Sequence, residues 1–145
     1  MDEAPARNAF EKAVETQRPD FETFFLSRLF GLTFSYTDET CRIEFPIHDF
    51  MFNPQGTLHG GVIAFALDVA MGHLLKHVTG VPGTTLEMKV QYLSPLRPPH
   101  AVCESRFLRK GQTISFLEAR MWDHEGTLAA VANATWRMGK SLAER

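Results

Sequence analysis

The 145-residue sequence lacks the features by which several classes of protein are recognised. It has no long cluster of Lys and Arg, and its formal net charge is -2, so no extended nucleic-acid-binding surface is expected. No apolar run approaches the roughly 20 residues that a membrane-spanning helix needs. The first ten residues, MDEAPARNAF, contain no apolar core of a signal peptide. These absences predict a cytoplasmic protein that binds neither nucleic acid nor a membrane.

Cysteine is scarce, and internal repeats and low-complexity linkers are missing. The two cysteines, Cys41 and Cys103, have no CxxC partners, which favours free thiols in a reducing compartment. A length of 145 residues suits one domain, and 44% apolar with 22% charged residues is ordinary for a globular protein. We therefore expect a single domain over residues 1–145, with a helical extension over 1–30 and a core over 31–138.

Helical patterns occur near the beginning and in the middle of the sequence. Residues 5–17 and 20–30 are predicted as two short helices, the second capped by Asp20 and ended by Gly31. Residues 59–78 form the one long helix candidate. This segment is apolar nearly all round, so we expect it to be buried on most sides.

Alternating apolar and polar residues predict strands in the rest of the chain. The predicted strands are 32–38, 40–47, 84–93, 100–109, 112–122 and 127–138. In the last strand, Ala130, Ala132 and Ala134 share one face, where small side chains would let a helix lie close. The order of elements predicts an α+β fold in which an antiparallel sheet wraps around one long central helix. Such a sheet leaves an edge or face to cover, so we expect an oligomer.

The stretch NPQGTLHGG, residues 53–61, carries the clearest chemical signal. His59, Gly60 and Gly61 lie at the predicted start of the long helix, where the first backbone N–H groups have no partner within the helix. Because glycine leaves room for a ligand, these N–H groups can stabilise a carbonyl oxygen as it becomes an oxyanion. His59 is a candidate for either a helix-capping role or a catalytic one.

Asp68 lies inside the same predicted helix, between Leu67 and Val69. A carboxylate is costly to bury without a partner, so a functional role is favoured over a purely structural one. Gly60 and Asp68 are separated by roughly 12 Å along a helix axis. One reacting carbonyl must lie about 3 Å from both the attacking group and the oxyanion donor. If both residues act on one substrate, they must come from two subunits across a two-fold interface.

The segment NPQGTLHGG followed after six residues by Asp68, with PGTTLEMKVQYLSP and RKGQT downstream, resembles a known family. It is similar to the phenylacetyl-CoA thioesterase branch of the hotdog superfamily, which is related to the 4-hydroxybenzoyl-CoA thioesterases. The resemblance covers about residues 45–138. It implies the hotdog fold, an acyl-CoA substrate, and a homodimer that assembles into a homotetramer, with no metal or redox cofactor. The sequence Arg97-Pro98-Pro99-His100 departs from the family pattern.

The resemblance also assigns residues to the chemistry. It implies that Gly60 donates the oxyanion hydrogen bond and that Asp68 of the facing subunit is the nucleophile or general base. Asn53 and His59 correspond to residues that position the carbonyl and the loop. Thr85 stands where a hydroxyl group orients the water, and the alternation of its predicted strand places it on the polar side.

Other residues are candidates for substrate binding. Gly61 is expected at the substrate, and Arg97, Arg109 and Lys110, near predicted strand ends, could bind the phosphates of coenzyme A. Phenylalanines could line an acyl or aryl pocket; the candidates are those in 21–30 together with Phe50 and Phe52.

The function that these features predict is hydrolysis of an acyl- or aryl-CoA thioester to the free acid and coenzyme A. A non-catalytic acyl-CoA sensor, a hydratase or dehydratase, and a scaffold protein are alternatives. Asp68 argues against the sensor and the scaffold, because neither needs a carboxylate in an apolar helix. The hydratase is disfavoured because it needs an acid/base pair suited to a C–H proton.

Overall fold

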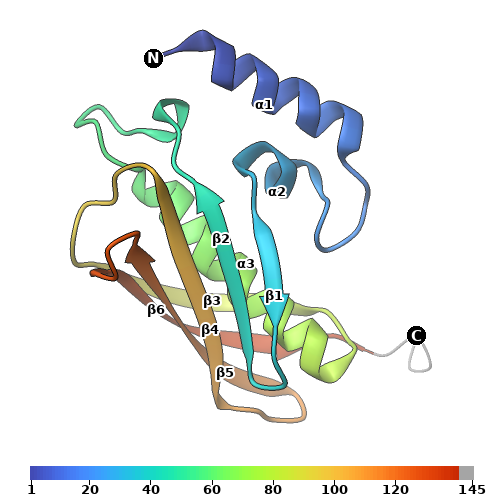
Figure 1. The fold of residues 1–145 in the computed structure, drawn as a ribbon. Helices are drawn as coiled ribbons and strands as arrows, with labels where there is room; N and C mark the ends of the chain where they lie inside the picture. Colours follow the sequence, from blue (N-terminus) through green and yellow to red (C-terminus); the bar gives the residue numbers. More distant parts are fainter. Residues whose placement is uncertain (141–145) are drawn as a thin grey trace.

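A computed structural model describes residues 1–140, so the last five residues of the predicted 1–145 domain lie outside the described residues. A six-stranded antiparallel sheet curves around one long helix, as Figure 1 shows, and the predicted α+β architecture is confirmed. The elements are α1 (Glu3–Thr16), α2 (Phe25–Phe30), β1 (Thr33–Tyr36), β2 (Thr40–Pro46), η1 (Asp49–Met51), α3 (Gly60–Thr79), β3 (Gly83–Tyr92), β4 (His100–Arg109), β5 (Ile114–Asp123) and β6 (Leu128–Met138). The strand order is β1-β2-β4-β5-β6-β3.

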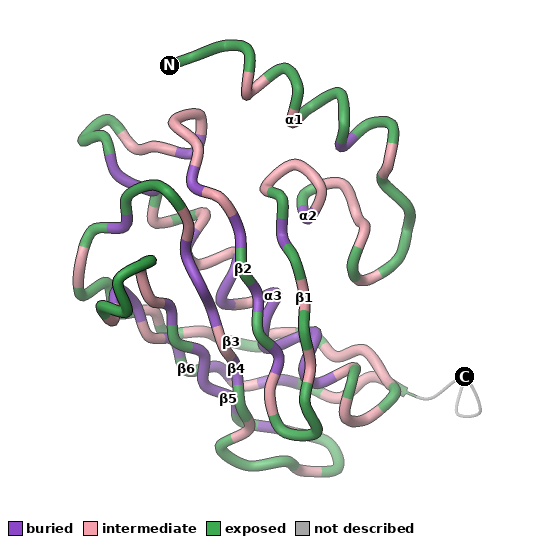
Figure 2. Tube along the Cα trace, viewed as in Figure 1, coloured by how far each residue is buried: buried purple, intermediate pink, exposed green. Residues whose placement is uncertain are grey.

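The long helix α3 packs its apolar surface against the concave face of the sheet. Figure 2 shows burial concentrated in α3 and in the strands, whereas α1 buries only Ala13. Ala130, Ala132 and Ala134 are all buried on the inner face of β6, as their spacing predicted. The helix lies close to the sheet at Gly72, which contacts the Trp136 side chain of β6. A Cβ on Gly72 would lie 2.8 Å from the Trp136 ring, so no larger residue fits there unless the ring moves.

By length and mean hydropathy alone, α3 could cross a membrane, which the sequence analysis did not expect. More than half of its most apolar stretch is buried inside the fold, with 56% of those residues covered. This burial is the reason that the helix is apolar nearly all round, because a helix wrapped by a sheet has little surface in contact with water. The helix therefore serves as the core of the domain.

The prediction of a helix over residues 20–30 is wrong for its first half, because α2 begins only at Phe25. The prediction that Asp20 caps this helix is also wrong, because the N-cap of α2 is Phe24. Asp20 Oδ1 instead accepts hydrogen bonds from the N–H groups of Glu22 and Thr23 at 3.0 and 2.7 Å, within a turn that precedes the helix. The Thr23 carbonyl accepts from the Arg18 N–H at 2.9 Å, which closes the segment into a loop. This loop lies against α3 and becomes part of the site described below.

Candidate active site

The loop that leads into α3 is ordered by the side chain of Asn53. Its Oδ1 accepts from the Gln55 N–H at 2.9 Å, and its Nδ2 donates to the Thr57 hydroxyl at 3.0 Å. The backbone N–H of Asn53 also donates to the Thr57 carbonyl at 2.8 Å. These bonds fix the turn that delivers Gly60 to the start of the helix.

The first backbone N–H groups of α3 differ in whether they have an acceptor. The Gly61 N–H donates to Nδ1 of the His59 side chain at 2.8 Å, so His59 caps the helix. The N–H groups of Val62 and Ile63 both donate to the His59 carbonyl. Within residues 1–140, the Gly60 N–H has no acceptor. Gly60 is therefore the residue that can offer a free donor, whereas the Gly61 N–H is already used.

Tyr92, which the sequence analysis did not single out, covers one side of Gly60. Its hydroxyl donates to the Gly60 carbonyl at 3.0 Å. A Cβ on Gly60 would lie 3.3 Å from the Tyr92 ring, so the close contact favours glycine at this position. Both residues line a cavity of about 310 Å³ that also includes Asn53. Tyr92 is the last residue of β3, and its contact with Gly60 joins segments 32 residues apart, so no local sequence pattern indicates it.

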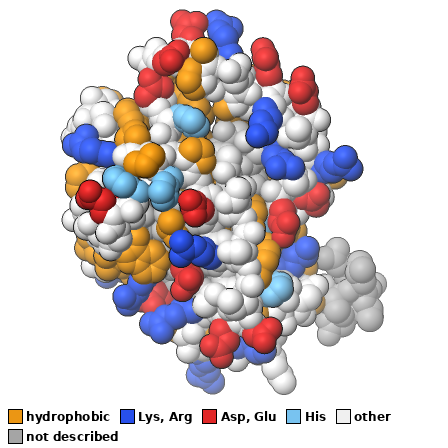
Figure 3. All heavy atoms as spheres, viewed as in Figure 1, with side chains coloured by type: hydrophobic (Ala, Val, Ile, Leu, Met, Phe, Trp, Pro, Cys, Tyr) orange, Lys and Arg blue, Asp and Glu red, His pale blue; other side chains and the backbone are white. Residues whose placement is uncertain are grey.

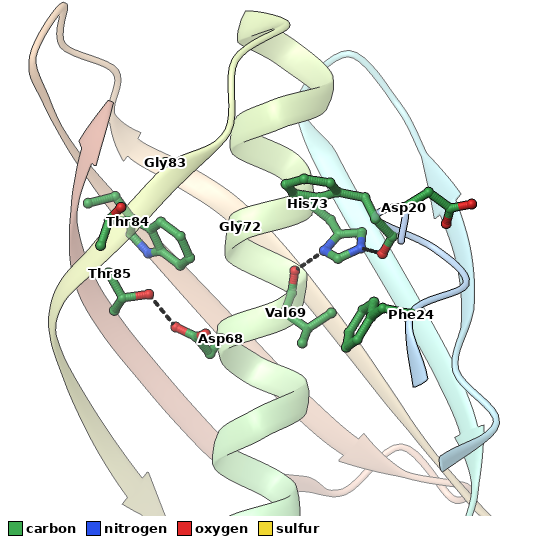
Figure 4. Close-up of a pocket in the computed structure, with 11 residues that line it drawn as sticks. Asp20, Phe24, Asp68, Val69, Gly72, His73, Gly83, Thr84 and Thr85 are labelled. Atoms are coloured by element: carbon green, nitrogen blue, oxygen red, sulfur yellow. Dashed lines mark hydrogen bonds between the residues drawn. The ribbon is translucent and has the colours of Figure 1, made fainter. Parts of the chain in front are cut away.

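The second half of the site is centred on Asp68, two turns further along α3. The Thr85 hydroxyl donates to Asp68 Oδ1 at 2.7 Å, as the dashed line in Figure 4 shows. Burial raises the pKa of the Asp68 carboxyl, and the hydrogen bond from Thr85 opposes this effect only in part. No salt bridge holds Asp68 among the ion pairs of the described chain. A carboxylate with a raised pKa and no cation nearby suits a base or nucleophile.

Thr85 reaches Asp68 because β3 is irregular. Simple alternation places Thr85 on the polar side of the strand and Leu86 on the inner side, but the register with β6 shifts between Thr85 and Glu87. This β-bulge turns Thr85 toward α3 and leaves Leu86 53% exposed. The prediction that Thr85 lies on the polar side is therefore wrong, and its hydrogen bond to Asp68 of the same chain was not predicted.

A groove of about 460 Å³ lies beside Asp68. Its lining residues are Asp20, Phe21, Phe24, Asp68, Val69, Gly72, His73, Gly83, Thr84, Thr85 and Trp136. Phe21 and Phe24, two of the phenylalanines that could line an acyl or aryl pocket, line this groove. Phe50 and Phe52 line neither this groove nor the cavity at Gly60 in the described part of the chain.

The two halves do not meet within one chain. Asn53 and Gly60 line one cavity and Asp68 and Thr85 line the other, and the two sets of lining residues share no member. Gly60 and Asp68 are separated along α3 by roughly 12 Å. A single carbonyl group therefore cannot contact both in one copy of the chain.

The three basic residues predicted to bind phosphates are not brought together. Arg97 lies near the loop before α3, where its guanidinium approaches the Gly56 carbonyl at 3.4 Å. Arg109 is the last residue of β4 and Lys110 follows it, whereas Arg97 lies three residues before the strand begins; the strand spans roughly 30 Å. On the face drawn in Figure 3, Lys and Arg side chains are interspersed with acidic ones. One phosphate group cannot contact all three basic residues of one chain.

Replacing Thr85 with Ala is expected to lower kcat roughly 10-fold, because water can partly replace the lost hydroxyl. The acid limb of the pH–rate profile should also move to higher pH, since the Thr85 hydrogen bond lowers the pKa of Asp68. Thr84→Ala is the matched control, because Thr84 is exposed on the adjacent position and makes no hydrogen bond to Asp68. A loss larger than that of Asp68→Asn would reverse the expected order of importance.

The chain matches the model of the thioesterase superfamily over residues 55–130, which is more than half of its length. A protein of Saccharolobus solfataricus named as a possible esterase is 32% identical over 95 residues, covering 65% of this chain and 68% of that protein. A medium/long-chain acyl-CoA thioesterase of Escherichia coli is 33% identical over 100 residues, covering 59% of this chain and 64% of that protein. The chain thus spans about two thirds of the length of these relatives.

Two solved structures have the same fold. A Bacillus halodurans protein crystallised with CoA gives a TM-score of 0.80 at 19% identity, covering 93% of both chains. The Escherichia coli PaaI protein from the phenylacetic acid degradation operon gives 0.79 at 13% identity, covering 92% of this chain and 97% of that one. The predicted hotdog fold and the predicted class of enzyme are therefore confirmed at the level of the family. The chain belongs to the thioesterase superfamily, a group of thioester hydrolases.

Proposed function

We propose that the protein hydrolyses acyl-CoA thioesters to the free acid and coenzyme A, at a site formed by two copies of the chain. The observation that carries this proposal is the free Gly60 N–H at the start of the same helix that holds Asp68. The Escherichia coli and Mus musculus relatives are named as acyl-CoA thioesterases, which supports this substrate class. The CoA in the Bacillus halodurans structure agrees with it.

In the proposed reaction, the Gly60 N–H of one subunit binds the thioester carbonyl oxygen. Asp68 of the second subunit takes a proton from water while the water oxygen bonds to the carbonyl carbon. The carbonyl electron pair moves to oxygen and is stabilised there by the Gly60 N–H. When this pair returns, the C–S bond breaks, and the departing coenzyme A thiolate takes up the proton that Asp68 accepted from water, which regenerates the Asp68 carboxylate. Thr85 holds Asp68 Oδ1, which leaves Oδ2 to face the water.

A covalent route uses the same residues. The Asp68 carboxylate then bonds directly to the carbonyl carbon, the thiolate leaves, and water cleaves the resulting anhydride to regenerate the carboxylate. Both routes give the same products and need no metal or redox cofactor. Both also need the Gly60 donor and the Asp68 carboxylate at one carbonyl group.

The edge strand β3 supports the proposed association of two copies. Within the described chain it pairs only with β6, so its other edge has no strand beside it. Leu86, Tyr92 and Leu93, on or next to this strand, are 53%, 54% and 55% exposed. An edge strand with exposed apolar side chains favours pairing with another chain. We propose a homodimer through this edge that assembles further into a homotetramer.

The proposed function is tested by measuring thiol release from purified protein with a thiol-reactive dye. Acetyl-, hexanoyl-, palmitoyl- and phenylacetyl-CoA are compared, with and without EDTA. We expect turnover of at least one acyl-CoA, and no loss of rate with EDTA. Tight binding of every acyl-CoA without thiol release would instead identify a sensor, and a rate that chelation abolishes would contradict the metal-free reaction.

A further inference from the structure

The groove beside Asp68 has features that select among acyl groups. We propose that it binds the acyl part of the thioester and accepts uncharged, apolar acyl groups, with Asp20, Phe21 and Phe24 as its specificity-determining wall. This inference rests on the proposed function, because it places the scissile carbonyl next to Asp68.

The shape of the groove gives the direction of the acyl group. Figure 4 shows α3 as the floor, with Thr85 on one side and Phe24 on the other. Asp68 and Gly72 are four residues apart, so they lie one above the other on the same helix face. At Gly72 the Trp136 ring takes the place of a side chain, 2.8 Å from where a Cβ would lie, so the ring forms part of the groove floor. An acyl group that begins at Asp68 therefore runs along α3, across the Trp136 ring and between the two walls.

The wall opposite β3 is aromatic and held in place. The buried His73 has one ring nitrogen 2.8 Å from the Val69 carbonyl and the other at the Phe21 carbonyl. The ring of His73 also stacks on Phe34, with 4.5 Å between centroids. These contacts tie the loop before α2 to the helix and to the sheet. The aromatic rings of Phe21 and Phe24 are thereby fixed at the groove rather than free to move with the loop.

The charges at the groove are unfavourable for an acidic ligand. Asp20 and Asp68 both line it, and no Lys or Arg of the described chain does. Hydrogen bonds from Thr23 lower the pKa of Asp20, so this carboxylate is ionised at neutral pH. Burial lowers the pKa of His73, which disfavours a positive charge on this imidazole. The Lys76 ammonium packs over the Phe21 ring, 4.3 Å from its centroid, but Lys76 does not line the groove.

A carboxylate at the far end of an acyl chain would therefore lose water and gain no counter-charge from the Lys and Arg residues of the described chain that forms the groove. Removing an unpaired carboxylate from water is unfavourable. A methyl group at the same position would instead contact apolar and aromatic surface. The residues that make the wall also precede residues 55–130, the part that matches the superfamily model. The proposed selection against charged acyl groups therefore depends on the N-terminal segment of this chain.

The charge selection is tested with hexanoyl-CoA and adipoyl-CoA, which have the same chain length and differ in the terminal carboxylate. We expect kcat/KM for hexanoyl-CoA to exceed that for adipoyl-CoA at least ~100-fold, the scale of an unpaired buried charge. Asp20→Asn should reduce this ratio several-fold, because it removes the negative charge that repels the adipoyl carboxylate. The loop should keep its shape, because the amide oxygen can still accept the hydrogen bonds from the Glu22 and Thr23 N–H groups. Glu22→Gln is the control, because Glu22 is next to the wall but does not line the groove. Similar rates for both substrates, or a ratio that Asp20→Asn leaves unchanged, would overturn the proposal.

The aromatic wall is tested with Phe24→Leu and Phe24→Ala. Their kcat/KM values for phenylacetyl-CoA and for a bulkier naphthylacetyl-CoA are compared with those of wild type. We expect the ratio of kcat/KM for naphthylacetyl-CoA to kcat/KM for phenylacetyl-CoA to rise by about 10-fold in the Ala variant and by less in the Leu variant. Phe10→Ala, which removes a 55% exposed ring from α1, should leave the preference unchanged. A shift as large in Phe10→Ala, or none in either Phe24 variant, contradicts the assignment of the wall. If wild type hydrolyses no acyl-CoA, the proposed function fails instead.

Discussion

Replacing Asp68 with Asn is expected to lower kcat at least ~100-fold on the best acyl-CoA, the scale of a lost general base or nucleophile. The Asn side chain has nearly the same shape, and its amide oxygen can still accept the Thr85 hydrogen bond. It cannot accept a proton from water or attack a carbonyl at a useful rate. The loss should therefore appear in kcat while the circular dichroism spectrum stays unchanged. An Asn variant with nearly wild-type turnover would remove Asp68 from the mechanism.

The same substitution is expected to make the protein more stable at neutral pH. Burial raises the pKa of Asp68 in the folded protein above 3.8, the value of an unperturbed aspartate. A raised pKa means that the ionised carboxylate destabilises the folded state at pH values above both pKa values. Asp68→Asn should thus have a higher Tm than wild type at pH 7, with the difference shrinking as the pH falls toward 3.8. A lower Tm at pH 7 would contradict this assignment. Activity of the wild type should fall as the pH drops through the raised pKa.

Mixing two inactive variants is expected to restore about a quarter of wild-type activity, by the symmetry of a two-fold interface. One variant is Asp68→Asn and the other is Gly60→Pro, which removes the N–H donor. After subunit exchange, a mixed dimer has one site with both substitutions and one with neither. Random mixing makes about half of the dimers mixed, and each of these has one intact site of two. The expected recovery follows from helix geometry, because Gly60 and Asp68 of one chain are too far apart to share a carbonyl.

The structure supports proline as a test of the Gly60 donor. Gly60 is the first residue of α3, a position where helices accept proline, and His59 before it has the extended backbone angles φ -62° and ψ 134° that proline requires of its neighbour. Gly60→Ala is the control, because it adds a Cβ against Tyr92 but keeps the N–H. We expect a ~100-fold or greater loss for Gly60→Pro and a much smaller one for Gly60→Ala. No recovery despite proven subunit exchange, or a fully active monomer at high dilution, would disprove the shared site.

The parts of the fold with a regular pattern could be predicted from the sequence. The helix α3 could be predicted because a helix buried on most sides is apolar nearly all round. The strand over residues 100–109 could be predicted because apolar and polar residues alternate along a strand that is buried on one face. Gly60 and Asp68 could be singled out because a glycine at a helix start and a carboxylate in an apolar helix each have few structural explanations. For the site residues that were assigned by family resemblance, the structure gives the positions, and their catalytic roles stay predictions.

The remaining features depend on contacts between distant segments. The β-bulge in β3 turns Thr85 toward Asp68, and it arises from pairing with β6, some fifty residues later. The contact of Tyr92 with Gly60 likewise joins two segments that are distant in the sequence, β3 and the start of α3. The loop before α2 takes its shape from the backbone hydrogen bond between the Arg18 N–H and the Thr23 carbonyl. This hydrogen bond competes with the predicted helix over residues 20–30, for which Asp20 is a suitable cap residue. A single sequence shows the local preference in each case, but not the tertiary contact that overrides it.

The position of Trp136 gives the protein an intrinsic optical signal. Its ring lies against Gly72 on the floor of the groove, and its Nε1 is buried without a hydrogen-bond partner in the described chain. The sequence contains only one other tryptophan, Trp122, so a Trp122→Phe protein would have a single indole fluorophore. Filling the groove would change the surroundings of that indole. Its emission would then report occupancy by an acyl chain even in a variant that cannot turn it over.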